Sequence, residues 1–235
     1  MTFHGDDRPP AGIWRLAEAT WLGARFWRGF GHIGPHGPEE GPPALVIPGW
    51  MAGDRTCLEL RRALGEAGWR VHPWRLGLNK KVEPDMLERL EGCIDALGAK
   101  QPVLVVGWSL GGLYARKLAR HCPNKVRAVV TLGSPFSGSL KQNNVWRLYE
   151  WVAGHSVDNP PVPRITDKPP VPTLALWSRR DGIVAPRSAR GIKGERDKAV
   201  EIGCSHMAFG ISKNATRRVA REIDIFLDEG DGRRS

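Results

Sequence analysis

The chain has 235 residues and a mass of 26.0 kDa, which is enough for one α/β domain with a full core. Its formal net charge is +10, but the basic residues are spread along the chain and no nucleic-acid-binding motif accompanies them, so we expect a solvated basic surface and no nucleic acid partner. No stretch approaches the roughly 20 apolar residues that a membrane-spanning helix needs, which predicts a soluble protein.

Residues 1–43 are predicted to be an extension before the core domain. The first ten residues lead into no continuous apolar run, and the four cysteines lack a paired or metal-like spacing, so we expect a cytoplasmic protein with free thiols. Residues 13–30 place aromatic side chains near helical spacing. This pattern predicts a helix that packs on the domain, with peripheral contact to an anionic membrane as the alternative.

The core domain is predicted to span residues 44–235 and to alternate strands with helices. Apolar runs bounded by glycine, proline or charge indicate buried strands at 44–49, 69–74, 102–109, 126–135, 173–178 and 198–206. Helical patterns lie between most of them, at 55–67, 84–97, 110–121 and 214–227. This order predicts the α/β class, with a mostly parallel, doubly wound sheet.

Residues 136–172 interrupt the alternation. They contain a predicted helix at 144–152 and then a proline-rich stretch that cannot be regular throughout. We expect a cap over one end of the sheet, with Trp146 and Trp151 lining a substrate pocket together with Trp108. The alternative for the cap residues is that they only pack the inserted helix on the domain.

The segment Gly107-Trp108-Ser109-Leu110-Gly111 fits the pattern G-x-S-x-G, with an apolar strand before it and a helical pattern after it. This is the setting of a nucleophile elbow, a turn so tight that side chains at the two glycines would collide with the neighbouring strand and helix. The pattern predicts that Ser109 is a nucleophile presented at the start of a helix.

A serine nucleophile needs a base, and a histidine titrates in the right range. Of seven histidines, only His206 follows the last predicted strand, where a short loop could return it to the carboxyl edge of the sheet. The base needs a carboxylate that fixes its tautomer, and Asp181 follows a strand between the serine and the histidine. Asp158, Asp167 and Asp197 are rivals that are less well placed.

The oxyanion formed by attack on a carbonyl must meet backbone N–H donors that are already in place. The Leu110 amide is one candidate because it follows the serine. The second should come from the loop after the strand at 44–49, where Trp50 is the first choice and Met51 the second.

These motifs resemble the α/β-hydrolase superfamily, in its bacterial lipase and carboxylesterase branch, over residues 44–227. The order Ser109, Asp181, His206 is that family's order, and the segments at 133–139 and 178–184 are similar to segments of bacterial triacylglycerol lipases. The Pro48-Gly49-Trp50 segment departs from the family, because Pro48 stands where many lipases have histidine.

The resemblance implies hydrolysis of carboxylic esters through an acyl-serine intermediate, without a metal or organic cofactor, on a small acyl ester or lipid substrate. Acyl transfer on the same three residues is an alternative that the sequence does not separate from hydrolysis, and peptidase and thioesterase activities stay open as well. A non-catalytic ligand-binding protein on a hydrolase scaffold is a third alternative.

Overall fold

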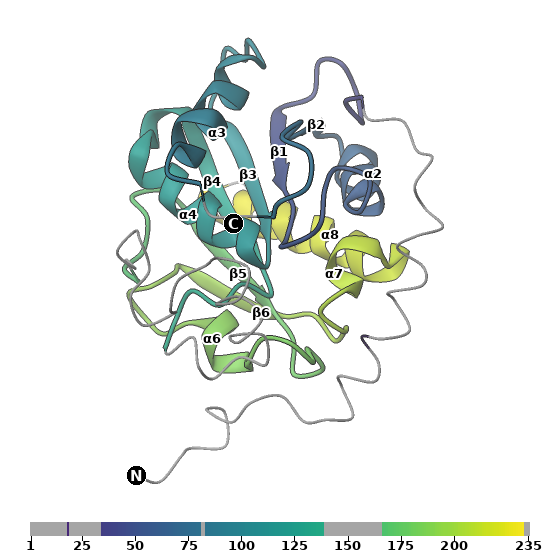
Figure 1. Ribbon diagram of the computed structural model, residues 1–235, viewed down its shortest axis with the longest axis vertical. Helices are drawn as coiled ribbons and strands as arrows, with labels where there is room; N and C mark the ends of the chain where they lie inside the picture. Colours follow the sequence, from purple (N-terminus) through teal and green to yellow (C-terminus); the bar gives the residue numbers. More distant parts are fainter. Residues whose placement is uncertain (1–17, 19–33, 81–82, 139–165, 233–235) are drawn as a thin grey trace, which may run out of the picture.

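A computed structural model describes residues 18, 34–80, 83–138 and 166–232. Their centre is a six-stranded, all-parallel sheet with the strand order β2-β1-β3-β4-β5-β6 (Figure 1). The strands are β1 (Pro43–Ile47), β2 (Arg70–Pro73), β3 (Val103–Trp108), β4 (Val126–Leu132), β5 (Thr173–Trp177) and β6 (Lys198–Glu201). The predicted α/β class and parallel sheet are therefore confirmed.

Helices cover both faces of the sheet. The described helices are α2 (Leu58–Glu66), α3 (Met86–Asp95), α4 (Leu110–His121), η2 (Pro123–Lys125), α6 (Pro186–Arg190), α7 (Ala208–Ile211) and α8 (Lys213–Gly230). Figure 1 shows α3 and α4 on one side of the sheet and α2 and α8 on the other. None of the helices in the described part of the chain is long and apolar enough to cross a membrane.

Two hydrophobic clusters explain why the sequences of the strands are continuous apolar runs. Leu104 and Val106 of β3 pack with α2, α7 and α8, whereas Val103 and Val105 of the same strand pack with α3 and α4. Successive side chains of a strand point to opposite faces, so a strand covered on both faces is apolar at every position.

Two of the predicted strands end three or more residues earlier in the structure. β4 ends at Leu132 because Gly133 adopts a positive φ of 53°, and β6 ends at Glu201, so that residues 202–207 form a loop that carries His206. The short helices α6 and α7 were not predicted, because four or five residues are too few to show a helical period.

The last residues before β1 already pack on the domain. His36 pairs with Val71 of β2 in an isolated antiparallel bridge, and Arg61 Nη2 of α2 donates a hydrogen bond of 2.6 Å to Gly34 O. The predicted helices at 13–30 and 144–152 lie outside the described residues, except for Glu18. The division into an extension of residues 1–43, a core domain and a cap stays a prediction.

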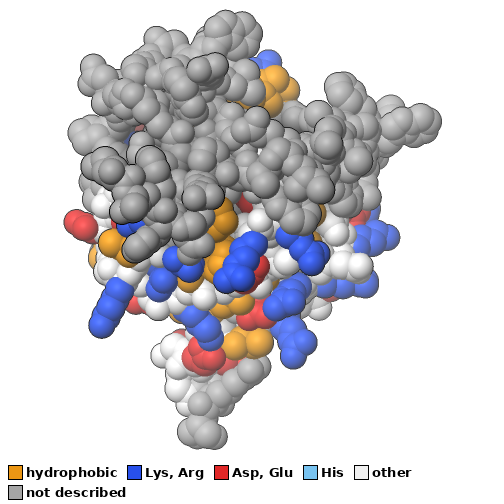
Figure 2. All heavy atoms as spheres, turned by 90° about the horizontal axis from the view of Figure 1, so that it is seen from below, with side chains coloured by type: hydrophobic (Ala, Val, Ile, Leu, Met, Phe, Trp, Pro, Cys, Tyr) orange, Lys and Arg blue, Asp and Glu red, His pale blue; other side chains and the backbone are white. Residues whose placement is uncertain are grey.

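Charged side chains are distributed over the described surface. Figure 2 shows Lys and Arg side chains interspersed with acidic and apolar ones on one face. Several are paired, including Arg217 with Glu66 and Lys198 with Glu229. Exposed ion pairs contribute little stability. The expected solvated surface stays a prediction.

Candidate active site

Ser109 lies between β3 and α4 in a strained turn. Its φ is 54° and its ψ is −119°, a conformation that is costly for a residue with a side chain. The turn is held by hydrogen bonds from Ser109 N to Leu132 O at 2.8 Å and from Gly112 N to Ser109 O at 3.0 Å. Ser109 is half-buried, whereas the residues on either side of it are buried. The predicted strand-turn-helix at this serine is therefore present.

The two glycines of the elbow are sterically required. A Cβ atom on Gly107 would lie 2.3 Å from Gly111 O, and a Cβ on Gly111 would lie 2.2 Å from Ile47 O. Both contacts are with backbone atoms, which cannot move aside as a flexible side chain could. Glycine at these positions allows β1, β3 and α4 to pack closely around Ser109, as the sequence predicts.

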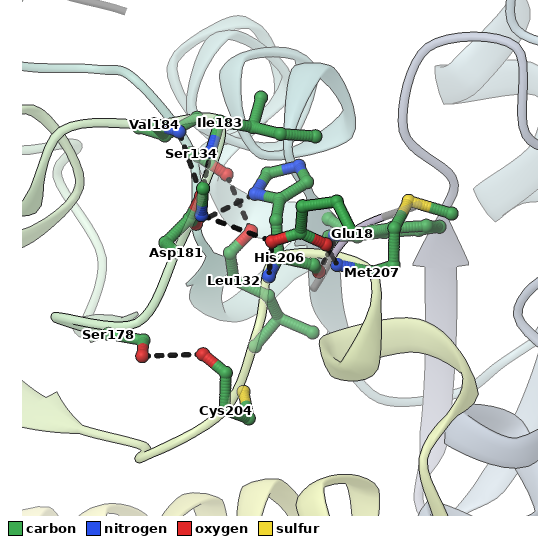
Figure 3. Close-up of polar contacts among 12 residues, drawn as sticks. Glu18, Leu132, Ser134, Ser178, Asp181, Ile183, Val184, Cys204, His206 and Met207 are labelled. Carbon is green, nitrogen blue, oxygen red and sulfur yellow. Dashed lines mark hydrogen bonds and ion pairs between the residues drawn. The ribbon is translucent and has the colours of Figure 1, made fainter. Parts of the chain in front are cut away.

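Asp181 and His206 are hydrogen-bonded to each other (Figure 3). The distance between His206 Nδ1 and Asp181 Oδ2 is 2.7 Å, and the two residues are 3% and 0% exposed, respectively. The other carboxylate oxygen, Oδ1, accepts hydrogen bonds of 2.8 Å from Ile183 N and Val184 N. A carboxylate only accepts, so Nδ1 carries the proton and Nε2 is left as the basic nitrogen.

The surroundings of His206 shift its pKa. Burial of the imidazole lowers its pKa, whereas the charge and hydrogen bond of Asp181 and the charge of Glu18 raise it. The pKa of His206 lies above its ordinary value of 6.5 as a result. The neighbouring carboxylates favour the imidazolium form, which is the form that a base acquires when it accepts a proton.

Trp108 supports the loop of residues 202–207, here called the histidine loop. Its Nε1 donates a hydrogen bond of 3.2 Å to His206 O, and the two ring centroids are 5.9 Å apart. Trp108 is 2% exposed and its ring packs against Gly210. The described residues therefore give Trp108 a packing role, and its expected contact with substrate stays a prediction.

Gly133 lies directly against the acid and the base. A Cβ atom at this position would be 2.9 Å from Asp181 Oδ2 and 3.1 Å from His206 Nδ1. Leu132, the residue before it, accepts the hydrogen bond from Ser109 N. The end of β4 therefore lies between the serine and the Asp181–His206 pair. Sequence analysis noted the segment at 133–139 but assigned it no such function.

The loop of residues 178–184, here called the acid loop, is joined to the histidine loop by Ser178. Its Oγ donates a hydrogen bond of 2.6 Å to Cys204 O and accepts one of 3.0 Å from Arg180 N (Figure 3). Ser178 is buried, so this link is protected from water. It links the end of β5 to the histidine loop.

The loop after β1 lies beside Ser109. A Cβ atom on Gly49 would be 3.2 Å from Ser109 Cβ. Met51 N donates a hydrogen bond of 2.7 Å to Asn79 O, so this N–H is already used and Met51 is not supported as an oxyanion donor. Among the described residues, the N–H groups of Trp50 and Leu110 have no hydrogen-bond partner. These two remain as the candidate pair of donors.

Glu18 is a buried carboxylate that sequence analysis assigned to no site. Its Oε1 accepts hydrogen bonds from Gly182 N at 3.1 Å and from His206 N at 2.6 Å, and its Oε2 accepts one from Met207 N at 2.9 Å (Figure 3). The only sequence signal was an acidic residue among the aromatic residues of the segment 13–30. That signal does not show which part of the domain the carboxylate contacts.

The rival acids and bases that the structure describes lie elsewhere. Asp197 binds Thr173 N at 2.8 Å, at the amino end of β5, whereas Asp181 follows the carboxyl end of that strand. Asp167 is exposed. His121 ends α4 and pairs with Glu91. The rival acid Asp158 and the predicted pocket residues Trp146 and Trp151 lie outside the described residues.

The arrangement brings two predicted residues into direct contact and places the third nearby. Asp181 and His206 form a buried acid–base pair, and Ser109 is attached through its backbone to the strand end that touches this pair. Ser109 Oγ has no hydrogen-bond partner within the described ranges. Chemically, the site offers an imidazole nitrogen, a half-buried hydroxyl and two unbonded backbone donors.

A family model described as the α/β hydrolase fold matches residues 79–159, a range that includes Ser109 but not Asp181 or His206. Among solved structures, an α/β hydrolase from the metagenome of lagoon sediments of Mar Chica, Morocco, superposes with a TM-score of 0.61 at 22% identity, covering 84% of this chain and 94% of that one. The chain has the α/β-hydrolase fold, and the solved structures similar to it include α/β hydrolases, esterases and lipases.

Curated relatives are similar to part of the chain. A pimeloyl-[acyl-carrier protein] methyl ester esterase of Shewanella sp. (strain MR-7) is 29% identical over 118 residues, which are 49% of this chain and 42% of the relative. A homoserine O-acetyltransferase of Trichlorobacter lovleyi is 27% identical over 158 residues, which are 57% of this chain and 43% of the relative. The chain therefore spans less than half the length of these relatives.

Proposed function

We propose that this α/β-hydrolase-fold protein is a serine esterase that hydrolyses carboxylic esters through an acyl-Ser109 intermediate. The observation that carries the proposal is the buried hydrogen bond of 2.7 Å between Asp181 Oδ2 and His206 Nδ1. It leaves Nε2 as the nitrogen that accepts a proton, at the carboxyl edge of the sheet where the elbow places Ser109. His206 is the base, and Asp181 sets its tautomer and balances the imidazolium charge.

In the acylation step, Ser109 Oγ attacks the carbonyl carbon of the ester while its proton passes to His206 Nε2. The carbonyl oxygen becomes an oxyanion and accepts hydrogen bonds from the N–H groups of Trp50 and Leu110. When this tetrahedral intermediate collapses, the bond to the alcohol oxygen breaks. The alcohol leaves with the proton held by His206, and the acyl group stays on Ser109.

In the deacylation step, His206 takes a proton from a water molecule that attacks the acyl carbon. The same two N–H groups stabilise the second oxyanion. The bond between the acyl carbon and Ser109 Oγ then breaks, and the serine oxygen takes back the proton from His206. The products are a carboxylic acid and the free enzyme, so no metal or organic cofactor enters the reaction.

The curated relatives support ester chemistry and suggest its substrate class. The similarity to a pimeloyl-[acyl-carrier protein] methyl ester esterase favours an ester with a small alcohol as leaving group. Acyl transfer is the second candidate, and the similarity to a homoserine O-acetyltransferase favours it. In that reaction a hydroxyl group of an acceptor, instead of water, attacks the acyl carbon on the same three residues.

A panel of p-nitrophenyl and methyl esters with short to long acyl chains tests the proposal. We expect wild-type protein to release carboxylic acid and Ser109→Ala to be inactive while still folded. Ser188→Ala is the matched control, because the buried Ser188 Oγ has no hydrogen-bond partner in the described part of the chain. Ester products formed in the presence of added alcohols would identify acyl transfer. An inactive wild type across the whole panel would contradict ester hydrolysis.

A further inference from the structure

Glu18 connects the two loops that carry the candidate acid and base. It lies 164 residues before Gly182 in the acid loop and 188 residues before His206 in the histidine loop, yet its carboxylate accepts hydrogen bonds from both. The N–H of His206 itself is one of the donors, at 2.6 Å. The next residue, Met207, provides another at 2.9 Å. The contact is therefore made with the backbone of the base and of its immediate neighbour.

These bonds are made away from solvent. Glu18 is 7% exposed, and a carboxylate is rarely buried to this extent unless hydrogen bonds replace its lost hydration. Three backbone N–H groups do this here, and hydrogen bonds to an ionised acceptor are about twice as strong as those between neutral groups. No side-chain cation contacts Glu18 among the described residues. The backbone of the two loops therefore stabilises the Glu18 charge.

We propose that Glu18 is a positioning residue of the active site, which fixes the acid loop and the histidine loop to each other and holds His206 in line with Asp181 and Ser109. The inference rests on the proposed function, in which His206 is the base. It makes Glu18 part of the catalytic apparatus, whereas the sequence predicts that residues 1–43 are an extension before the core domain. The described hydrogen bonds of Glu18 are all to backbone N–H groups, so it acts through the backbone of His206.

A second consequence is electrostatic. The charged side chains that act on the His206 imidazole are Asp181 from the acid loop and Glu18, and both raise its pKa. The Cys204 thiol lies on the histidine loop, and burial raises its pKa, so it stays neutral near pH 7. Gly133 and Trp108, which also contact the base, carry no charge. Loss of the Glu18 charge therefore lowers the pKa of His206.

Glu18→Gln is the variant that tests this role, because it keeps one acceptor oxygen and the size of the side chain but removes the charge. The amide nitrogen cannot accept, so at least one of the three N–H groups loses its partner. Glu40→Gln is the matched control, because it removes one acidic charge at an exposed position that also lies before β1. The readouts are kcat and KM for a p-nitrophenyl ester, and the NMR titration of the His206 imidazole.

We expect Glu18→Gln to lower kcat by about 100-fold with little change in KM, as a displacement of about 1 Å of a catalytic group does. The His206 titration and the acid limb of kcat/KM should both move to lower pH. Glu40→Gln should change neither. Unchanged kcat with an unshifted His206 titration in folded Glu18→Gln would overturn the proposal.

Two further measurements cover the other cases. If Glu18→Gln does not fold, amide hydrogen exchange in the wild type tests the contact instead. The N–H groups of Gly182, His206 and Met207 should all be strongly protected. Rapid exchange of all three would refute the contact. If the wild type hydrolyses no ester, the proposed function fails. The NMR titration and the amide exchange still report on Glu18 in that case, so the two failures are distinguishable.

Discussion

The Nδ1 atom of His206 lies 2.7 Å from Asp181 Oδ2, and the second oxygen of the same carboxylate is held by the backbone N–H groups of Ile183 and Val184. Each oxygen of Asp181 therefore has a separate function. One is fixed by its own loop, and the other accepts the hydrogen bond from the imidazole Nδ1–H. A substitution of Asp181 that keeps the shape of the side chain but puts a donor in place of an acceptor should impair activity far more than folding.

Asp181→Asn should lower kcat by about 10⁴-fold, because the amide can present a donor to Nδ1 and stabilise the wrong tautomer of His206. Steady-state kinetics on a p-nitrophenyl ester measure this. Asp197→Asn is the control, because Asp197 pairs with Lys168 at the opposite end of β5. If Asp181→Asn kept nearly normal kcat while Asp197→Asn lost it, the assignment of the acid would be wrong.

The pH dependence of kcat/KM should show an acid limb with a midpoint above 6.5. The reaction needs the neutral imidazole, and the pKa of His206 is raised above that ordinary value. Protonation of the base therefore begins at a higher pH as the solution is acidified, and activity is lost as pH falls through the raised pKa. Rates measured from about pH 5 to about pH 9 test this. A midpoint at or below 6.5 would disagree with the surroundings described for His206.

Gly133→Ala should impair catalysis more than stability. The added methyl group would press on Asp181 Oδ2 and His206 Nδ1, at 2.9 and 3.1 Å. Gly98→Ala is a close control. The φ of Gly98 is 58° and that of Gly133 is 53°, but a Cβ added to Gly98 would have no atom within 4 Å. Both variants should lose about 1 kcal/mol to backbone strain.

Kinetics and thermal unfolding of the two glycine variants separate these effects. Only Gly133→Ala should lose about tenfold or more in kcat, because a small displacement of catalytic groups causes a loss of about that size. Equal kcat in the two variants would mean that the end of β4 does not constrain the acid and the base.

Trp108→Phe should reduce kcat by about tenfold, because it removes the hydrogen bond that holds His206 O while keeping an aromatic ring in the core. Trp69→Phe is matched to it, since Trp69 is also buried and its Nε1 donates at the same 3.2 Å, to Asp224 Oδ1, far from the site. Both should lose about 1 kcal/mol of stability. A similar loss of kcat in both variants would show that the effect of Trp108 is general.

Much of the fold could be predicted because its strands are buried on both faces and its elbow has strict steric needs. The run around Val105 is apolar at every position, and Gly107 and Gly111 mark a turn where a Cβ would meet backbone atoms. The pairing of Asp181 with His206 followed from the shared carboxyl edge of parallel strands. These features depend on local sequence and on sheet topology alone.

Other parts of the site depend on contacts that no local pattern encodes. Met51 was predicted as an alternative donor, but its N–H is taken by Asn79, a residue beyond the next strand. Glu18 contacts the histidine loop across 188 residues of sequence, and an acidic residue on a predicted helix is ordinarily solvent-exposed. Gly133 was recognised only as part of a family-like segment, because its contact with the acid–base pair requires three loops to meet.

The central claim is that Ser109 is the nucleophile, and mass-spectrometric mapping of a fluorophosphonate adduct tests it most directly. Wild-type protein should carry one adduct, on Ser109, because among the serines that the structure describes only this one combines an elbow geometry with a nearby base. Ser109→Ala should not be labelled, and His206→Ala should be labelled far more slowly. An adduct on another residue, or folded wild type that does not react at all, would contradict the account.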